Sequence, residues 1–332
     1  MKGAKVTMAQ VAEKAGVSKA TVSRALAGSS LIGDEMRGHI ERISSEMGYV
    51  KKLQKRHSER SILTVKMVMP PIANEVSQLF YGFMHLVSGL RDGLAPSGVN
   101  VIVENNGKNY RPFPHKKGGS VDAFVFAFHC PTTEVIKEIE KKGVACVVLD
   151  RMVRGVRQVV SDHSDALYQI AEHLADRGVT GDCCFVAYEG IEAIVRERLH
   201  GFERGCDDCG IAFDAKDDVW MVAQPEEIHL KEVKALYEQG VRNFVAVNDI
   251  TGLILLQQLN RLGYQIPKDV RVTGCGRSPL RDITHPKLTT VDLSVYKLAF
   301  EAGRSLHQEV VKRVHAENAL LIQGEILPGK TT

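Results

Sequence analysis

The hydrophobic positions follow a helical spacing in the first fifty residues and a different pattern afterwards. Between Thr7 and Leu26 they predict two short helices joined by a tight turn at Gly16. Thr7 is placed to cap the first helix, with Gln10 completing a capping box, and Ser18 is placed to cap the second. The buried face of each helix carries apolar residues, namely Val11, Ala12 and Ala15, then Val22, Ala25 and Leu26.

A third predicted helix completes a small all-helical domain. Asp34 and Glu35 suit its first turn because negative charge favours the positive end of the helix dipole. Gly48 ends the helix and Tyr49 ends the domain. The apolar positions recur at spacings of four, three and four residues and are Met36, Ile40, Ile43 and Met47.

Residues 61–332 instead alternate between strand-like apolar runs and helical patterns, in two successive blocks. Such alternation predicts an α/β core of parallel sheets with helices on both faces, in two lobes with a cleft between them. The expected strands are 62–69, 99–104, 121–128, 144–149, 182–188, 218–222, 243–247 and 270–274. The expected helices are 77–94, 133–142, 166–177, 196–209, 228–239 and 251–262. Residues 107–120 are rich in Gly and Pro and are expected to form a loop, either a simple deletion or a partner-binding segment.

The charge of the chain is unevenly distributed. Residues 1–60 hold 12 Lys and Arg against 6 Asp and Glu, whereas the other residues hold 31 against 34, within a formal net charge of +3. A basic head on a mildly acidic body is typical of a polyanion-binding module joined to a separate core. There is no signal-peptide pattern and no apolar run of about 18 residues, so we expect a cytoplasmic protein without a membrane partner.

The outward face of the second helix has the chemistry of a DNA reader. Lys19, Ala20, Ser23 and Arg24 point away from the predicted core. Two short helices at a steep angle, with a small, basic and hydroxylic face on the second, are typical of a helix-turn-helix that enters the major groove.

The stretch VTMAQVAEKAGVSKATVSRALAG resembles the signature of the lactose and purine repressor family. The residues shared with that signature are Val6, Thr7, Val11, Ala12, Ala15, Gly16, Val17, Ser18, Thr21, Val22, Ser23, Arg24 and Gly28. The resemblance implies base contacts from Lys19, Ala20 and Arg24. It implies phosphate contacts from Thr7, Ser18, Thr21 and Ser23, which fix register without reading sequence. The alternative is that these are ordinary solvated helix residues.

The segment KKLQKRHSER at 51–60 occupies the position of the family's hinge but departs from its pattern. The usual Pro-Asn pair is Lys51 and Lys52, and the expected wedge leucine is Ser58. The basic residues of the segment can neutralise phosphates but are poorly suited to unstack a base step. We therefore expect a salt-sensitive hinge with little DNA kinking. Its candidate DNA contacts are Lys51, Lys52, Lys55 and Arg56.

The resemblance extends over the remaining chain to the family's periplasmic-binding-protein-like core, and it implies an effector site. Asp150, Arg198, Asn248 and Asp249 match family effector positions, with a structural ion pair or cap as the alternative for Asp150 and Arg198. The late GxDD turn of the family is GCGR at 274–277, so a carboxylate is absent there. The nearby cations suggest an acidic or phosphorylated effector, or a pocket that has lost its effector. These cations are Arg151, Arg196, Arg198 and Arg277.

Enzyme and metal motifs are weak. The pattern GxxxxGKT at 324–331 matches a phosphate-binding loop, but only Thr332 follows it where a helix is required. Cys206 and Cys209 have CxxC spacing, yet adjacent Cys183 and Cys184 would point to opposite sides of a strand, which argues against zinc. His129 and His163 lie near strand ends and are interpreted as polar lining of the cleft. We expect no catalytic residues, no cofactor and no metal.

The sequence therefore predicts a homodimeric transcription regulator that acts as a repressor and binds double-stranded operator DNA and a small-molecule effector. The predicted domains are a helix-turn-helix domain at 1–49, a basic hinge at 50–60 and an effector-binding and dimerisation core at 61–332. Within the core, one lobe spans about 61–160 and 292–320, and the other about 161–291 and 321–332. The alternatives are a cytoplasmic solute-binding protein, a regulator without a small-molecule effector, and an enzyme of nucleotide or sugar chemistry.

Overall fold

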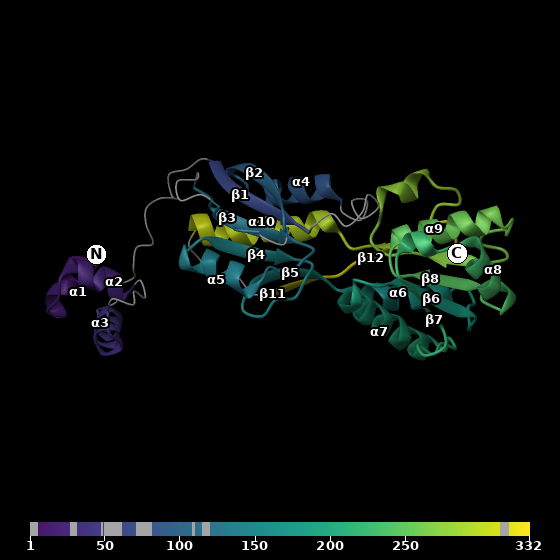
Figure 1. The fold of residues 1–332 in the computed structure, drawn as a ribbon, viewed down its shortest axis with the longest axis horizontal. Coiled ribbons are helices and arrows are strands. Elements are labelled where there is room, and N and C mark those ends of the chain that lie inside the picture. The colour runs from purple at the N-terminus through teal and green to yellow at the C-terminus, as the bar shows by residue number, and fades with distance from the viewer. Residues whose placement is uncertain are drawn as a thin grey trace. The chain divides into compact units, whose positions relative to one another are not determined.

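The computed structural model describes residues 6–26, 32–47, 49, 62–70, 82–107, 110–114, 120–312 and 319–332. The chain divides into two compact units, Met1–Arg60 and Ser61–Thr332. Both units can be followed by colour along the chain in Figure 1. The predicted hinge at 50–60 lies outside the described residues.

The first unit contains the three expected helices: α1 (Met8–Lys14), α2 (Lys19–Ala25) and α3 (Asp34–Glu46). Both predicted caps are confirmed. The Thr7 hydroxyl accepts the Gln10 amide while the Gln10 side chain accepts the Thr7 amide, and Ser18 accepts the amide of Thr21. Val11, Val22 and Ile40 are fully buried at the centre of this unit. Met36, at the start of the apolar positions of α3, is 42% exposed, so the buried part of that stripe starts at Ile40.

The first lobe of the second unit is built on a six-stranded sheet of order β11-β5-β4-β3-β1-β2, paired in parallel throughout. We call this sheet with its helices lobe 1. Its strands are β1 (Ile62–Met69), β2 (Gly98–Asn105), β3 (Ala123–Ala127), β4 (Ala145–Leu149), β5 (Arg157–Ser161) and β11 (Ala319–Ile322). Strand β3 is buried along its whole length, as expected of a central parallel strand with cover on both faces.

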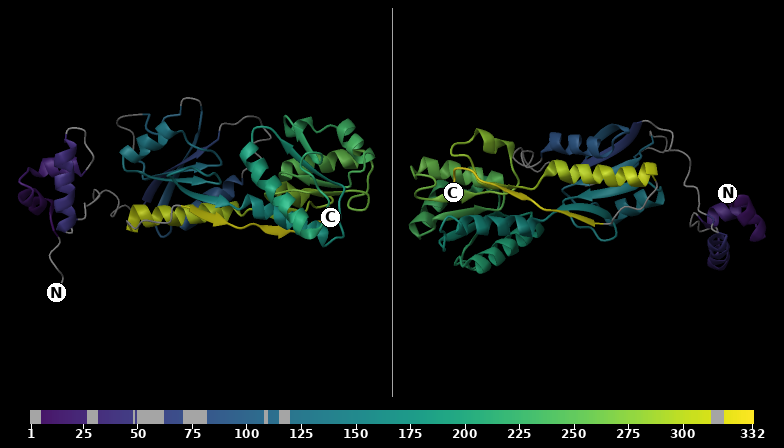
Figure 2. Two further views of the ribbon diagram at one scale, coloured as in Figure 1. Left: turned by 90° about the horizontal axis from the view of Figure 1, so that it is seen from below. Right: turned by 180° about the vertical axis from the view of Figure 1, so that it is seen from behind.

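One face of this sheet packs against α4 (Phe83–Gly93) and α10 (Val295–His307), which lie side by side in Figure 2. The other face packs against α5 (Thr133–Lys141) and against Tyr110 and Phe113. Phe113 meets Phe124 edge-on with ring centroids 5.4 Å apart. The described residues of 107–120 form a loop, as predicted. The aromatic side chains of Tyr110 and Phe113 in this loop cover part of this face of the sheet.

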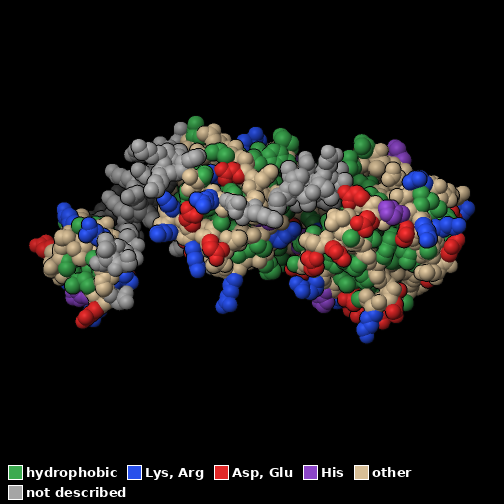
Figure 3. All heavy atoms as spheres, viewed as in Figure 1, with side chains coloured by type: hydrophobic (Ala, Val, Ile, Leu, Met, Phe, Trp, Pro, Cys, Tyr) green, Lys and Arg blue, Asp and Glu red, His purple; other side chains and the backbone are tan. Residues whose placement is uncertain are grey.

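The second lobe is built on a four-stranded parallel sheet of order β7-β6-β8-β9 and is called lobe 2. Its strands are β6 (Cys183–Tyr188), β7 (Val219–Val222), β8 (Asn243–Ala246) and β9 (Arg271–Thr273). Its helices are α6 (His163–Ala175), α7 (Glu192–Cys209), α8 (Leu230–Glu238) and α9 (Asp249–Arg261). Acidic and basic side chains are interspersed over the face of this lobe drawn in Figure 3.

Helices α6 and α7 approach each other closely because glycines stand at their contact. A Cβ atom at Gly201 would collide with the backbone of Ser164, and one at Gly205 would lie 2.7 Å from Ala171 Cβ. Only glycine lets two helix backbones come this near. The contact brings the start of α6 against the middle of α7.

The chain passes three times between the two sheets. It leaves β5 for α6, leaves the strand β10 (Thr290–Asp292) for α10, and leaves β11 for β12 (Glu325–Leu327). Strands β10 and β12 form a small antiparallel pair of their own, and the last crossing is the yellow track in Figure 2. The segment 324–331 thus contains a strand and opens no helix, unlike a phosphate-binding loop.

The alternation of strands and helices is confirmed in type for every predicted element of the second unit, with differences at the ends. Helix α4 is described only from Phe83, and α6 begins earlier than expected, at His163. The pattern omits α10 and the short strands β5, β10, β11 and β12. Strand β5 opens on Arg157 and Gln158, whose polar side chains hide its strand character. Within the described residues, no helix is both long and apolar enough to span a bilayer.

Candidate DNA-reading helix and effector cavity

Helix α2 presents the face that the sequence predicts for DNA. Lys19, Ala20, Ser23 and Arg24 are all exposed, whereas Val22 and Ala25 on the opposite side are buried. This separation follows from the helical period, because positions 22 and 25 lie three residues apart on one face. Arg24 and Lys19 can donate to the base edges of guanine, and the small Ala20 permits a close approach to the groove floor.

The hydroxyl residues lie at the starts of the two helices, where phosphate contacts are expected. The hydroxyls of Ser18 and Thr21 are 2.9 Å apart, and Thr7 is exposed at the start of α1. Backbone amides at helix starts favour anions, so both places suit a phosphate oxygen. The remaining candidates for DNA contact lie outside the described residues: Lys51, Lys52, Lys55 and Arg56.

A cavity of about 220 Å³ lies between the two lobes of the second unit and is lined by residues from both. It opens at the carboxyl ends of β4, β6 and β8, where parallel sheets bind their ligands. Its polar lining comprises His85, Asp150, Arg151, Ser161, His163, Tyr188, Arg198, Asn248, Asp249, Arg277, Ser278, Asp292, Ser294 and Tyr296. The size suits a small metabolite.

Backbone strain is concentrated at this cavity. Five described residues other than glycine have a positive φ, and four of them line it: Phe128, Asp150, Arg277 and Ser294. A non-glycine residue in this region costs about 1–3 kcal/mol and persists only where its surroundings fix it. The cavity wall is thus held in a defined shape at the expense of stability.

Asp150 is the acidic centre of the lobe 1 side. It directly follows β4, is buried, and accepts the backbone amide of Ser161 at 3.1 Å. Its Oδ1 lies 3.2 Å from Nε2 of His163, and its Oδ2 lies 3.4 Å from Nη1 of Arg151. Burial opposes ionisation, but the charges and hydrogen bonds of His163 and Arg151 outweigh it and hold the pKa of this carboxyl below its usual value.

Arg198 is the cationic centre of the lobe 2 side. It comes from α7, is buried, donates to the carbonyl of Val247, and has Nη2 3.2 Å from Nδ1 of His163. The side chain of Asn248 caps α9 by accepting the amide of Thr251 and donates to the hydroxyl of Tyr188 at 3.1 Å. The cap is thus one role of Asn248, and its amide group also faces the cavity.

Asp249 is held by the wall behind the cavity. Its carboxylate accepts the hydroxyl of Thr290 and the amide of Ser278. Burial raises the pKa of Asp249 to about 6, against the lowering effect of these two hydrogen bonds. Much of the hydrogen-bonding capacity of this carboxylate is therefore used within the protein.

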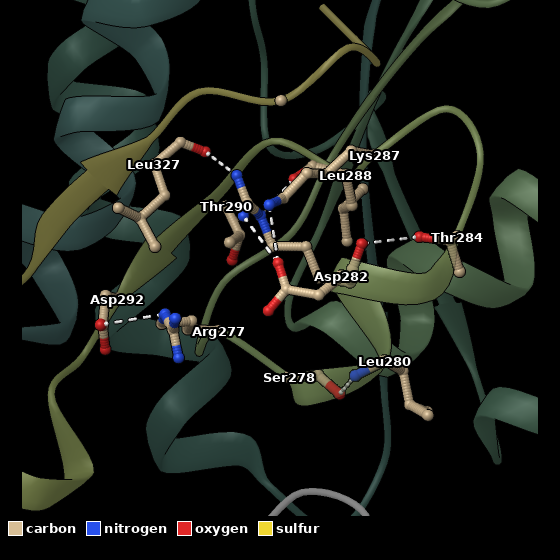
Figure 4. A network of polar contacts seen from close by, with 12 residues as sticks. Arg277, Ser278, Leu280, Asp282, Thr284, Lys287, Leu288, Thr290, Asp292 and Leu327 are labelled. Carbon is tan, nitrogen blue, oxygen red and sulfur yellow. Dashed lines mark hydrogen bonds and ion pairs between the residues drawn. The ribbon is translucent and has the colours of Figure 1, made fainter.

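The predicted arginines differ in their positions. Arg277 lines the cavity next to Gly276, and its Nε lies 3.4 Å from Oδ2 of Asp292, toward which it points in Figure 4. Arg196 is exposed on α7 and is not among the residues that line the cavity. Each of Arg151 and Arg277 therefore faces a carboxylate, so the cations of the cavity are balanced by acids.

Several lining residues were not singled out by sequence reasoning. Tyr188 and Ser161 end strands β6 and β5, and Asp292 ends β10. The position of Tyr188 at the carboxyl end of a predicted strand was the available signal, whereas β5 and β10 were not predicted. His163, interpreted as polar lining, does line the cavity, whereas His129 does not and instead contacts the carbonyl of Ala127.

No group of three or more His, Cys, Asp and Glu side chains with the geometry of a metal site occurs in the described ranges. The seven cysteines are all free thiols, and burial raises the pKa of Cys183 and of Cys184 to about 12.

Two family models match the chain. Residues 7–52 match the family described as bacterial regulatory proteins, lacI family, and residues 171–332 match the periplasmic binding protein-like domain. The first match covers the helix-turn-helix unit. The second begins within α6 and covers the rest of lobe 2 together with α10 and the strands β11 and β12.

Curated relatives are similar along nearly the whole chain. A ribose operon repressor of Bacillus subtilis is 24% identical over 98% of this chain and 98% of its own length. A catabolite control protein A of Priestia megaterium is 25% identical over 91% of both chains. These relatives therefore share the domain order of this chain, not only one of its units.

Solved structures share the fold. A complex of the transcriptional regulator CelR with cellobiose has a TM-score of 0.65 and 20% identity, and covers 99% of this chain and 100% of its own. A regulator from Enterococcus faecium with bound ribose has a TM-score of 0.68 and 22% identity, and covers 81% of this chain and 98% of its own.

Proposed function

Because the chain belongs to the lacI family of bacterial regulatory proteins, we infer that it is a sequence-specific DNA-binding transcription repressor controlled by a small metabolite. The observation that carries this proposal is the exposed reading face of α2, set on a capped and well-packed helix pair. The cavity between the lobes supplies the place for the metabolite. The protein is not an enzyme, and its relatives are repressors.

Two copies acting together fit this function best. A two-fold dimer places two reading helices on the half-sites of a near-palindromic operator and doubles the contacts of one head. A ligand that binds one angle between the lobes better than another shifts the population of that angle. Through the dimer this shift changes the spacing of the two heads and therefore the affinity for DNA.

The effector that the cavity favours is a small polyhydroxylated compound, with a sugar acid or sugar phosphate as the second candidate. Arg277 is paired with Asp292 and Arg151 with Asp150, so the positive charge of each guanidinium is balanced by a neighbouring carboxylate. Alternating carboxylates and guanidiniums suit hydroxyl groups, which both donate and accept. In addition, Oγ of Ser161 and Nε of Arg198 are buried at the cavity wall without a hydrogen-bond partner among the described residues. The ribose and cellobiose held by two structural relatives agree with this class.

The DNA-binding part of the proposal is tested by selecting sites from random double-stranded DNA with the intact protein. We expect a near-palindromic site, retarded by the intact protein and not by a chain that begins at Ser61. Affinity should fall steeply with salt, because phosphate neutralisation releases counterions. If the chain that begins at Ser61 bound the selected DNA as tightly as the intact protein, the assignment of DNA binding to residues 1–60 would be wrong.

The effector part is tested by thermal unfolding against neutral sugars, sugar acids, sugar phosphates and purines. A ligand at about a hundred times its dissociation constant adds about 2.7 kcal/mol of stability, which raises the melting temperature measurably. We expect the largest shift from a pentose or another small neutral sugar. A shift confined to sugar acids or phosphates would instead support Arg151 and Arg277 as anion partners. Silence across the panel would contradict an effector of either class.

A further inference from the structure

The charged side chains that line the cavity are balanced in number but differ in their access to a ligand. Asp249 and Arg198 are only 3% and 6% exposed, and the side chain of Asp150 is 10% exposed. The side chains of Arg277 and Asp292 are 38% and 33% exposed. This pair is therefore the one that a ligand reaches most readily. The described lining holds three carboxylates and three guanidiniums in all, namely Asp150, Asp249, Asp292, Arg151, Arg198 and Arg277.

The backbone holds the pair of Arg277 and Asp292 in place from both sides. Arg277 has a φ of 55°, and the amide of Gly276 before it donates to the carbonyl of Val291 at 2.8 Å, which ties this turn to β10. Asp292 ends β10, and its Oδ1 accepts the amide of Ser294 at 2.7 Å. Its Oδ2 lies 3.4 Å from Nε of Arg277, and Figure 4 shows the guanidinium turned toward it. The negative charge is thus fixed beside the guanidinium.

Gly276 leaves room for a ligand next to this pair. It lines the cavity, and no atom in the described part of the chain, apart from its chain neighbours, lies within 4 Å of the place that a Cβ would take. The contact of Arg277 with Asp292 uses Nε, and the guanidinium carries further N–H donors on Nη1 and Nη2. Such donors suit a phosphate or a carboxylate when no acid competes for them. The charge of Asp292 therefore decides which ligands this part of the cavity accepts.

We propose that Asp292 is a specificity-determining residue of the effector site, whose carboxylate, held beside Arg277, excludes anionic ligands in favour of neutral polyhydroxylated ones. An anion in contact with Arg277 would lie beside Asp292, and the repulsion between the two negative charges offsets the attraction to the guanidinium. A hydroxyl group carries no charge, and it can donate to Asp292 while it accepts from Arg277. The inference rests on the effector site proposed above, and it assigns the choice between a sugar and its phosphate or acid to one side chain.

The other guanidiniums of the cavity are not available in the same way. Arg198 is buried and donates to the carbonyl of Val247. Nη1 of Arg151 lies 3.4 Å from Oδ2 of Asp150, whose charge remains when Asp292 is replaced. Loss of the charge at position 292 therefore frees Arg277 alone, and any anion site that appears should depend on Arg277.

The selectivity is tested with inorganic phosphate as the probe and Asp292→Asn as the variant. Asn keeps the shape of the side chain and an oxygen that can accept the amide of Ser294. Thermal unfolding of the full-length protein is followed while phosphate replaces chloride at constant ionic strength. We expect Asp292→Asn to bind phosphate roughly tenfold more tightly than the parent, because a neighbouring like charge is worth about one pKa unit or more to an ion. The double variant Arg277→Gln/Asp292→Asn should lose this gain.

Asp282→Asn is the matched control. Asp282 is exposed, lies 2.7 Å from Nζ of Lys287, and is not among the described residues that line the cavity. The variant removes a carboxylate from another ion pair of lobe 2, but the cation that it frees is exposed to solvent, where charges act weakly. Its response to phosphate should match that of the parent, which also accounts for the basic first unit and for the general stabilising effect of phosphate. Asp292→Ser removes the charge with a shorter side chain and should show the same gain as Asp292→Asn.

Three results would overturn the proposal. The parent could bind phosphate as tightly as Asp292→Asn and Asp292→Ser do, the gain could persist without Arg277, or Asp282→Asn could gain as much. These measurements need no effector. A neutral sugar can therefore fail in the unfolding panel while the selectivity stands, and an absent gain for phosphate refutes the selectivity without deciding whether a sugar binds.

Discussion

Gly201→Ala is expected to destabilise the second unit by about 3 kcal/mol, at the upper end of what overpacking costs. The added methyl group would overlap backbone atoms of Ser164 in α6, and backbone atoms cannot rotate away as a side chain can. The two helices must then separate, which exposes apolar surface along their whole contact. Urea unfolding of the intact protein, followed by circular dichroism, measures the loss.

Gly205→Ala is the graded control on the same helix. Its added methyl group would meet the side chain of Ala171 at 2.7 Å and the backbone of Tyr168 at 3.1 Å, a milder overlap. We expect a loss of about 1 kcal/mol for this variant. Equal stability of Gly201→Ala and the parent would show that the close approach of α6 and α7 is not needed.

Arg24→Ala is expected to weaken binding to the selected operator by about 1–3 kcal/mol, or roughly 5-fold to 150-fold. The loss should be largest for the parental site and small for random DNA, since a base contact carries sequence preference and a phosphate contact does not. Arg24 is exposed and outside the packed face of α2, so the free energy of unfolding should not change. Fluorescence anisotropy with labelled operator and with a scrambled duplex measures both affinities.

Lys14→Ala removes the same charge from the exposed end of α1 and serves as the control. This variant should lower the affinity for the operator and for the scrambled duplex by the same small factor. Undiminished preference for the operator in Arg24→Ala would mean that this side chain does not read bases.

Sequence reasoning succeeded where the signal is local. The caps at Thr7 and Ser18 are set by residues three positions apart, and the structure has both. The alternating strands and helices of the second unit also follow from short-range patterns. The short strands β5, β10, β11 and β12 were not predicted, because runs of only three to five residues carry little periodicity.

The candidate site was predictable in part, for reasons that depend on geometry. Asp150, Asn248 and Asp249 follow strands whose ends meet at one cavity, as parallel sheets require. Arg196 and Arg198 are two positions apart on α7, about 200° around the helix, so both cannot face the cavity. The contacts of His163 with Asp150 and Arg198 could not be predicted, because they join residues brought together only by tertiary packing.

The three passages between the lobes mean that lobe 1 cannot be finished until nearly all of the chain has been made. Helix α10 packs on α4 and on the sheet, and the hydroxyl of Tyr296 donates to Asp92 across 204 residues. At ribosomal rates of about 5–20 residues per second, this interval corresponds to roughly 10–40 s. During that time the strands of lobe 2 can pair and close, while the apolar face of β4 and β5 that α10 will cover, with Val147, Leu149 and Val159, remains without it. A newly made chain therefore passes through a stage with one completed lobe and one open sheet, which is where chaperone binding and aggregation compete with folding.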